Sequence, residues 1–131
     1  MSEALTWINF TYDEFACKCG CARNEMDPDT IDALQAIRDQ IPFPMIVSSG
    51  YRCEDHPIEA KKLTPGPHNT GLAVDIVCSG SAALMILSLA LKSGEFDGFG
   101  LNQRGDMDQR FVHLDQCEAS QYRPRPHIWS Y

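Results

Sequence analysis

The segment GPHNTGLAVDIV, residues 66–77, carries two side chains that can bind a metal ion. His68 lies in a loop of Pro, Gly and Asn, and Asp75 follows seven positions later inside an apolar run. A carboxylate in a buried strand is costly unless something pairs with it. In a strand over 72–78, alternate side chains face opposite ways, so Asp75 shares its face with small residues such as Ala73. That face leaves space for a ligand beside the carboxylate.

A second segment, RFVHLD at 110–115, repeats this combination. His113 and Asp115 project from the same face of a predicted strand, while Val112 and Leu114 face the other way. An imidazole and a carboxylate that project together from an apolar strand again require a partner.

A single Zn²⁺ bound by His68, Asp75 and His113 would account for both segments. Two imidazoles and a carboxylate suit zinc, and three protein ligands leave a fourth position open, as in catalytic sites. A bound zinc would lower the pKa of a water molecule to about 7 and polarise a substrate carbonyl. Spacing alone leaves a second interpretation open, in which His68 lies on the surface, Asp75 bonds to backbone and His113 is a hydrogen-bonded core residue.

Length and charge narrow the functional classes. The 131 residues suit a single domain over 1–131 with its own core. A net charge of −7 and scattered basic residues argue against a nucleic-acid partner. No apolar run approaches the roughly 20 residues that cross a bilayer, and the N-terminal segment lacks the apolar stretch of a secretory signal. We therefore expect a monomer that is made in the cytoplasm without membrane insertion.

The role of the six cysteines stays open at this level. Three of them crowd into the segment CKCGC at 17–21, and the others are Cys53, Cys78 and Cys117. An even count permits disulfides, but a chain of this length without a secretory signal does not need them. Pairing between cysteines two positions apart would be strained. Reduced thiols, one or more disulfides and a second metal site are the three alternatives.

The predicted elements mix helices with short strands. Helices are expected over 28–40 and 81–93, and strands over 44–50, 72–78, 96–101 and 110–115. Asp27 suits the N-cap of the first helix and Pro28 its first turn. A polar loop over 51–71 is long enough to be functional, and the tail over 123–131 is expected to be irregular but packed. Without regular βαβ alternation, the fold class is α+β, with a small antiparallel-type sheet flanked by helices.

Several motifs, taken in order, resemble a known family. They are SGYRC at 49–53, HNTGLAVDI at 68–76, FVHLD at 111–115 and the ending RPHIWSY, preceded by FACKCGC at 15–21. This set resembles the M15 zinc peptidases, which include D-alanyl-D-alanine carboxypeptidases, D-alanyl-D-alanine dipeptidases and phage peptidoglycan endopeptidases. Hedgehog signalling domains share their fold. The short M15 proteins of phages and prophages, which carry a similar cysteine-rich segment, look most alike.

The resemblance assigns roles to individual residues. It implies that His68, Asp75 and His113 are the zinc ligands and that Arg52 binds substrate and stabilises the oxyanion. A guanidinium suits that role because it keeps its charge and offers several donors. Tyr51 and Trp129 are further candidate substrate contacts, with packing against the core or the cleft rim as the alternative for both.

The general base is the point at which the sequence departs from part of the family. One group of relatives places an acid three residues before the last zinc histidine, where this chain has Arg110. The candidate base is therefore Asp115, which faces the predicted metal. The alternative for Asp115 is to orient a zinc histidine by a hydrogen bond. Further candidates for the base are Asp106, Asp108, His56 and His127.

These inferences predict a zinc peptidase that cleaves a peptide bond in the stem or cross-link of bacterial peptidoglycan. A phage or prophage enzyme of this kind would reach the wall after release by a holin or delivery by a virion. Two other functions stay open. One is a zinc-containing structural or binding module of a virion without catalysis, and the other is a cytoplasmic dipeptidase that acts on free D-Ala-D-Ala.

Overall fold

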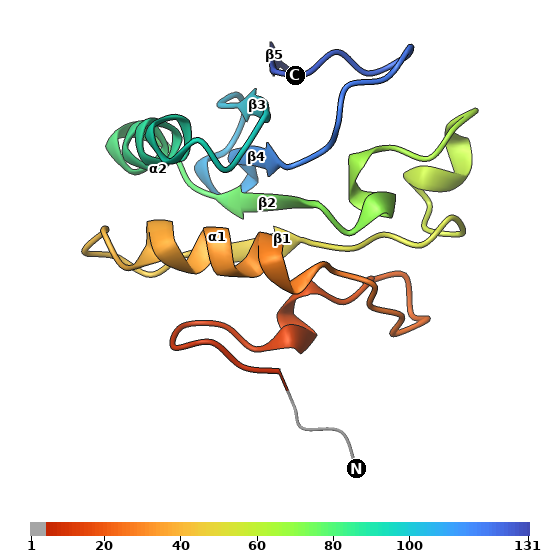
Figure 1. The fold of residues 1–131 in the computed structure, drawn as a ribbon, viewed down its shortest axis with the longest axis horizontal. Coiled ribbons are helices and arrows are strands. Elements are labelled where there is room, and N and C mark those ends of the chain that lie inside the picture. Colours follow the sequence, from red (N-terminus) through yellow and green to blue (C-terminus); the bar gives the residue numbers. More distant parts are fainter. Residues whose placement is uncertain (1–4) are drawn as a thin grey trace.

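Five short strands form one mixed sheet in the described part of the chain. The structure, a computed structural model, describes residues 5–131, so the first four residues, on which the expected lack of a signal partly rests, lie outside it. The strands are β1 (Ile46–Ser49), β2 (Ala73–Val77), β3 (Gly98–Asn102), β4 (Phe111–Asp115) and β5 (His127–Ser130), as labelled in Figure 1. Their order in the sheet is β1-β2-β4-β3-β5. Neighbours are antiparallel except β3 and β5, which run parallel.

Two α-helices, α1 (Pro28–Arg38) and α2 (Gly80–Ser93), complete an α+β fold, as predicted. Helix α1 begins as the sequence indicates, because the Asp27 side chain accepts a hydrogen bond from the Asp29 amide. Helix α2 ends at Gly94, which adopts the left-handed conformation that glycine tolerates. None of the helices among residues 5–131 is long and apolar enough to cross a lipid bilayer.

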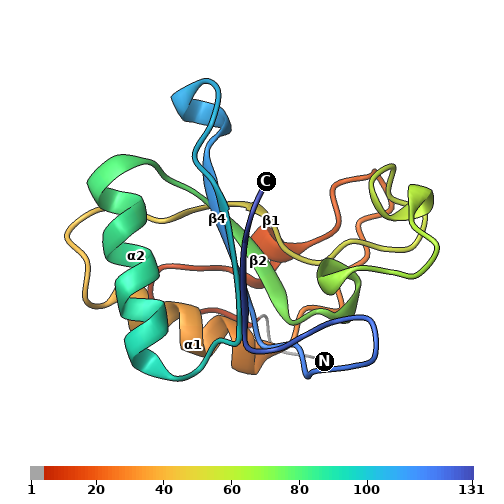
Figure 2. The same ribbon diagram turned by 90° about the horizontal axis from the view of Figure 1, so that it is seen from above.

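The two faces of the sheet differ in what covers them. Figure 2 shows α1 and α2 on one side of the sheet and the loop over 51–71 on the other. Val74 and Ile76 of β2 and Val112 and Leu114 of β4 are fully buried in the apolar core with the helices. The intervening residues of both strands therefore face the loop side, where the polar side chains lie.

The C-terminal tail corrects one expectation. It was predicted to be irregular, but His127–Ser130 form β5, which pairs in parallel with β3. Prolines at 124 and 126, directly before the strand, obscure it in the sequence. The register sets Trp129 against Gly100, where a Cβ would overlap the indole ring. The missing side chain of Gly100 is thus what lets Trp129 lie over the sheet.

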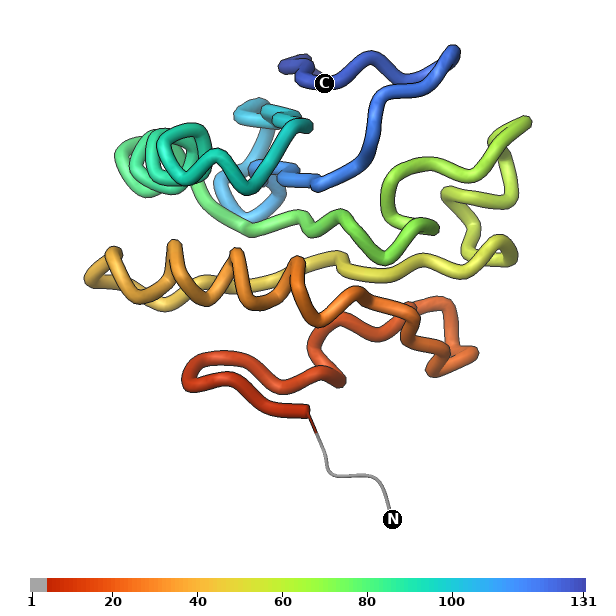
Figure 3. Tube along the Cα trace, viewed as in Figure 1, coloured from red at the N-terminus to blue at the C-terminus, as the bar shows by residue number. Residues whose placement is uncertain are grey.

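The loop over 51–71 is folded rather than extended, as its course in Figure 3 shows. It contains two short 3-10 helices, η2 (Glu59–Lys61) and η3 (Pro67–Thr70). The buried carboxylate of Glu59 accepts hydrogen bonds from the Gly66 amide at 2.8 Å and from Lys62 Nζ at 2.8 Å. An ionised group inside the loop thereby holds the turn that leads into η3.

Candidate metal centre

Three side chains converge on the loop-covered face of the sheet. His68 comes from η3, Asp75 from β2 and His113 from β4, and all three are buried. His68 Nε2 and His113 Nδ1 lie 3.2 and 3.0 Å from Asp75 Oδ1, and 3.2 Å from each other. The antiparallel pairing of β2 with β4 sets Asp75 directly opposite His113. These are the three residues that the sequence predicts as metal ligands.

The outer nitrogen of each imidazole is held by an acceptor. His68 Nδ1 lies 2.8 Å from the Gly50 carbonyl oxygen, and His113 Nε2 lies 2.7 Å from Asp115 Oδ2. Because a carbonyl and a carboxylate can only accept, these two nitrogens carry the protons. The lone pairs of His68 Nε2 and His113 Nδ1 then point at the Asp75 carboxylate. Three acceptors this close repel one another unless a cation lies between them, so the donor set fits a metal ion.

The electrostatics of the group keep it charged. Burial acts to raise the pKa of Asp75, but when the two imidazoles are protonated and no cation lies between them, the charges and hydrogen bonds of His68 and His113 lower that pKa well below its usual range. Burial likewise opposes ionisation of Asp115, whose pKa is lowered by hydrogen bonds from His113 and Arg125. Burial acts to lower the pKa of His113, and the hydrogen bonds that its doubly protonated ring makes to Asp115 and Asp75 raise it. Two buried carboxylates thus remain ionised near neutral pH.

Asp115 is enclosed by donors and has no exposed surface. Arg125 donates to both oxygens, from Nε to Oδ1 at 2.9 Å and from Nη2 to Oδ2 at 2.8 Å. The Cys117 amide adds a third hydrogen bond to Oδ1 at 3.1 Å, and His113 occupies Oδ2. Asp115 is also absent from the lining of the neighbouring cleft. This arrangement favours the orienting role over the general-base role.

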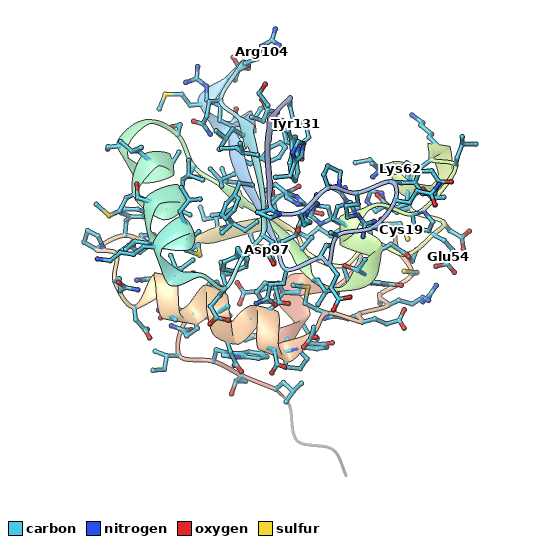
Figure 4. The ribbon with its side chains drawn as sticks, turned by 45° about the horizontal axis from the view of Figure 1, so that its top comes forward. Cys19, Glu54, Lys62, Asp97, Arg104 and Tyr131 are labelled. Carbon is cyan, nitrogen blue, oxygen red and sulfur yellow. The ribbon has the colours of Figure 1, made fainter. Side chains whose placement is uncertain are left out.

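A cleft of about 780 Å³ opens beside the three converging residues. Four basic residues and two acidic residues line it, namely Lys18, Arg52, Lys62, Arg110, Asp75 and Asp108. The cleft is therefore locally basic although the whole chain carries a net charge of −7. Figure 4 shows Lys62, on the loop side, away from the two helices.

The sequence as a whole decides the family. The family model described as Peptidase M15 matches residues 8–115. The chain belongs to the peptidase M15 family. The match includes His68, Asp75, His113 and Arg52, and no curated protein matches the sequence. M15 peptidases are typically zinc-dependent, so membership supports a metallopeptidase, and the three converging side chains are able to hold its metal ion.

Arg52 of this M15 peptidase lies between the metal centre and the folded loop. Its Nη2 is 3.4 Å from Asp75 Oδ2, and its Nη1 is 3.7 Å from Glu59 Oε2. Its Nε is buried without a hydrogen-bond partner among residues 5–131. The guanidinium lines the cleft beside the three converging side chains.

The two aromatic candidates of the M15 site differ in their surroundings. Tyr51 is buried, packs with Cys17 and Cys53, and donates from its hydroxyl to Glu25 at 2.6 Å. Tyr51 also lines the cleft, but the hydrogen bond to Glu25 engages its hydroxyl and favours packing over substrate contact. Trp129 lies with its ring centroid 5.1 Å from that of His113 and lines the cleft. Its position at the cleft wall agrees with either rim packing or substrate contact.

Two residues that shape the candidate site, Glu59 and Arg125, were not predicted from the sequence. Glu59 anchors the loop that carries His68 and pairs with Arg52, but it lies in a polar stretch where nothing marks it as buried. Arg125 holds Asp115 from a tail interrupted by prolines. The one sequence signal for a residue such as Arg125 was the position of Asp115 in an apolar strand, because a buried carboxylate requires a partner.

The close packing of Gly98 against Asp115 predicts that one added methyl group at Gly98 destabilises the protein. A Cβ at Gly98 would overlap the Asp115 carboxylate, so Gly98→Ala should lower the free energy of unfolding by about 1–3 kcal/mol. Chemical denaturation measures this change. In the Asp115→Ala background the same substitution should cost close to nothing, because the overlapping group is gone. An equal cost in both backgrounds would contradict this explanation.

Proposed function

We propose that this M15 peptidase hydrolyses a peptide bond in the stem or cross-link peptides of bacterial peptidoglycan, with Zn²⁺ held by His68, Asp75 and His113. The observation that carries the proposal is the convergence of two imidazole lone pairs and a carboxylate within 3.2 Å. A bound Zn²⁺ supplies a Lewis acid for the scissile carbonyl and lowers the pKa of a water molecule.

The charge of the cleft supports the substrate class. Stem peptides of peptidoglycan carry free carboxylates, and Lys18, Lys62 and Arg110 line the cleft around the metal centre. An acidic chain gains no long-range attraction to an anionic wall from its net charge. Recognition in this proposal comes from the basic lining, and Arg52 stabilises the negative charge that develops on the carbonyl oxygen.

Asp108 is our candidate for the proton acceptor. It lines the cleft and is exposed in the turn before β4, whereas Asp115 is enclosed by donors on both oxygens. In this mechanism Asp108 accepts a proton from the attacking water and returns it to the leaving amine. A carboxylate beside the attacking water can take up and release that proton within one catalytic cycle.

His56, the other acid–base side chain at the cleft, suits a different task. Its Nδ1 accepts a hydrogen bond from the Ile58 amide at 3.1 Å, so its proton lies on Nε2 when the ring is neutral. Burial and the neighbouring Arg52 lower the pKa of His56 and favour that neutral form. His56 is thus a hydrogen-bond donor to substrate rather than an acceptor of protons.

Asp108→Asn should lower kcat by about 10²–10⁴-fold and leave the metal content unchanged, because only proton transfer is lost. Steady-state kinetics and metal analysis of the same preparation measure the two effects. Asp106→Asn is the matched control, since Asp106 is exposed in the same turn but does not line the cleft. Equal activity of the two variants would remove Asp108 from the mechanism.

The proposed activity is tested by incubating the purified protein with peptidoglycan, with and without a chelator. We expect chelator-sensitive release of new amines. Absence of such release would favour a zinc-containing binding or structural module, the alternative supported by Arg110 at the position where some relatives carry an acid. Cleavage of free D-Ala-D-Ala without action on the wall would favour a cytoplasmic dipeptidase. The proposed phage or prophage enzyme would reach the wall by holin release or virion delivery.

A further inference from the structure

We propose that Cys17, Cys19, Cys21 and Cys53 form a second metal site, a closed tetrathiolate centre that binds a structural Zn²⁺. The four sulfur atoms lie at a separate place from the cleft's metal centre. They join the turn over 17–22, called the N-terminal turn below, to the segment that carries Arg52. Figure 4 labels Cys19 and Glu54 on this side of the molecule. The proposal does not depend on the peptidase activity.

The sulfur positions fit a tetrahedron. Cys53 Sγ lies 3.6 Å from Cys17 Sγ, 3.5 Å from Cys19 Sγ and 3.7 Å from Cys21 Sγ. All four sulfur atoms lie within 4.8 Å of one another. A tetrahedral zinc with Zn–S bonds of about 2.3 Å has sulfur–sulfur edges of about 3.8 Å. The three distances from Cys53 therefore match the edges of a zinc tetrathiolate.

A disulfide explains this arrangement less well. A disulfide joins two sulfur atoms at about 2.05 Å, whereas Cys53 lies at nearly the same longer distance from three sulfur atoms. Cys53 could bond to only one of them, and the remaining two would stay as a strained pair two or four positions apart. Four thiolates around one cation use all the sulfur atoms equally.

The backbone of the N-terminal turn presents the thiols in one direction. Gly20 has φ +105° and Ala22 has φ +59°, so the chain curls through left-handed conformations around Cys21. The Cys53 amide donates to Cys17 Sγ at 3.3 Å, and the Arg23 amide donates to Cys21 Sγ at 3.3 Å. Such N–H···S hydrogen bonds stabilise thiolates in metal sites. Left-handed geometry at a non-glycine residue indicates that the turn is held by something stronger than its own propensity.

The choice of metal follows from the donors. Soft thiolate ligands select zinc or iron over the hard cations, and four thiolates in tetrahedral array are typical of structural zinc. Cys17 and Cys53 are buried while Cys19 and Cys21 are exposed, so the metal has a path from solvent. A closed set of four ligands leaves no position for substrate, and the site stabilises the fold.

The second site would also support the cleft, a consequence that rests on the proposed function. Cys53 follows Arg52 directly, and the Gly50 carbonyl holds His68 Nδ1 at 2.8 Å. The Tyr51 amide donates to the Phe15 carbonyl at 2.8 Å, which ties the same segment to the chain just before the N-terminal turn. A metal that clamps Cys53 to this turn therefore fixes the backbone on which Arg52 and His68 depend.

Metal analysis of matched variants tests the proposal. The wild-type protein, purified under reducing conditions without chelator, should contain two zinc ions per chain, and Cys19→Ala/Cys21→Ala should lose one. Both substituted thiols are exposed, so the fold should survive, and circular dichroism checks this. Cys78→Ala/Cys117→Ala, which removes two thiols outside the cluster, should keep both ions. Asp75→Ala should lose the other ion and keep the one bound by thiolates.

Cobalt substitution gives a second readout that needs no variant. Co²⁺ bound by the wild-type protein should show intense sulfur-to-metal charge-transfer absorption, which Asp75→Ala should retain and Cys19→Ala/Cys21→Ala should lose. Unchanged zinc content in the double cysteine variant, or absence of that absorption, would overturn the proposal. Cys53 found in a disulfide by non-reducing peptide mapping would also overturn it. If Asp75→Ala keeps both zinc ions while Cys19→Ala/Cys21→Ala loses one, the proposed active-site metal is wrong and the tetrathiolate site stands.

Discussion

Asp75→Ala should abolish metal binding at the cleft and, with it, peptide hydrolysis. Asp75 contributes the one anionic oxygen that both imidazoles approach, at 3.2 Å from His68 and 3.0 Å from His113. Loss of a residue that merely orients a ligand costs roughly 10–100-fold in metal affinity or activity. Removal of the ligand itself should cost more than that.

Two further effects act in the same direction. Without Asp75, Arg52 loses an ion-pair partner at 3.4 Å and keeps Glu59 at 3.7 Å, so the guanidinium is free to shift away from the cleft. The remaining site would hold two neutral imidazoles, which bind Zn²⁺ less tightly than the same pair with a carboxylate. The variant should therefore lose both the metal and the position of the proposed oxyanion donor.

Calorimetric titration of Zn²⁺ into metal-free protein measures the change in affinity. The Cys19→Ala/Cys21→Ala background restricts the titration to the cleft, because the proposed tetrathiolate site is then removed. The control is Asp106→Ala, which removes an exposed carboxylate outside the cleft lining. It should bind Zn²⁺ with the same affinity as the Cys19→Ala/Cys21→Ala protein. Retained affinity and turnover in Asp75→Ala would show that the three converging residues are not the metal centre.

Asp115→Ala should strongly destabilise the protein. The Asp115 carboxylate has no exposed surface, and the Arg125 side chain is 6% exposed. Removing one partner from a buried ion pair leaves an uncompensated charge and costs about 3–5 kcal/mol in the free energy of unfolding. Denaturant unfolding measures this loss. The matched control is Asp97→Asn, since Asp97 is exposed just before β3, its backbone pairs with Asp115 and His127, and its carboxylate acts on Arg125 through its charge alone.

The milder Asp115→Asn separates the two roles considered for this residue. An orienting residue tunes metal affinity, so the variant should bind Zn²⁺ roughly 10–100-fold more weakly and regain turnover when zinc is saturating. A general base cannot be replaced by added metal, so turnover would then stay low at every zinc concentration. The enclosure of Asp115 by Arg125, Cys117 and His113 leads us to expect recovery.

The candidate ligands could be found from the sequence because the signal is local. Alternation along 72–78 and 110–115 shows which side chains share a face, and polar groups on a small-residue or apolar face stand out. The α+β class and both helices follow from equally local patterns, such as Asp27 and Pro28 at the start of α1. The prediction of an irregular tail over 123–131 was wrong. Two prolines conceal the edge strand that follows them, and its partner, β3, lies more than 20 residues earlier.

By itself the sequence determined the faces of β2 and β4, but only the tertiary structure decided their register. Shifting the pairing by two residues would bury the same apolar face, and it would set Asp75 opposite Phe111 or Asp115 instead of His113. Only the tertiary structure likewise decided that Arg125 lies beside Asp115, 10 residues away in the sequence. It also decided that Cys53 lies beside the turn at 17–21, 32–36 residues away. Side-chain alternation is a property of each strand alone, whereas the partners that compensate a buried charge are chosen by packing of the whole chain.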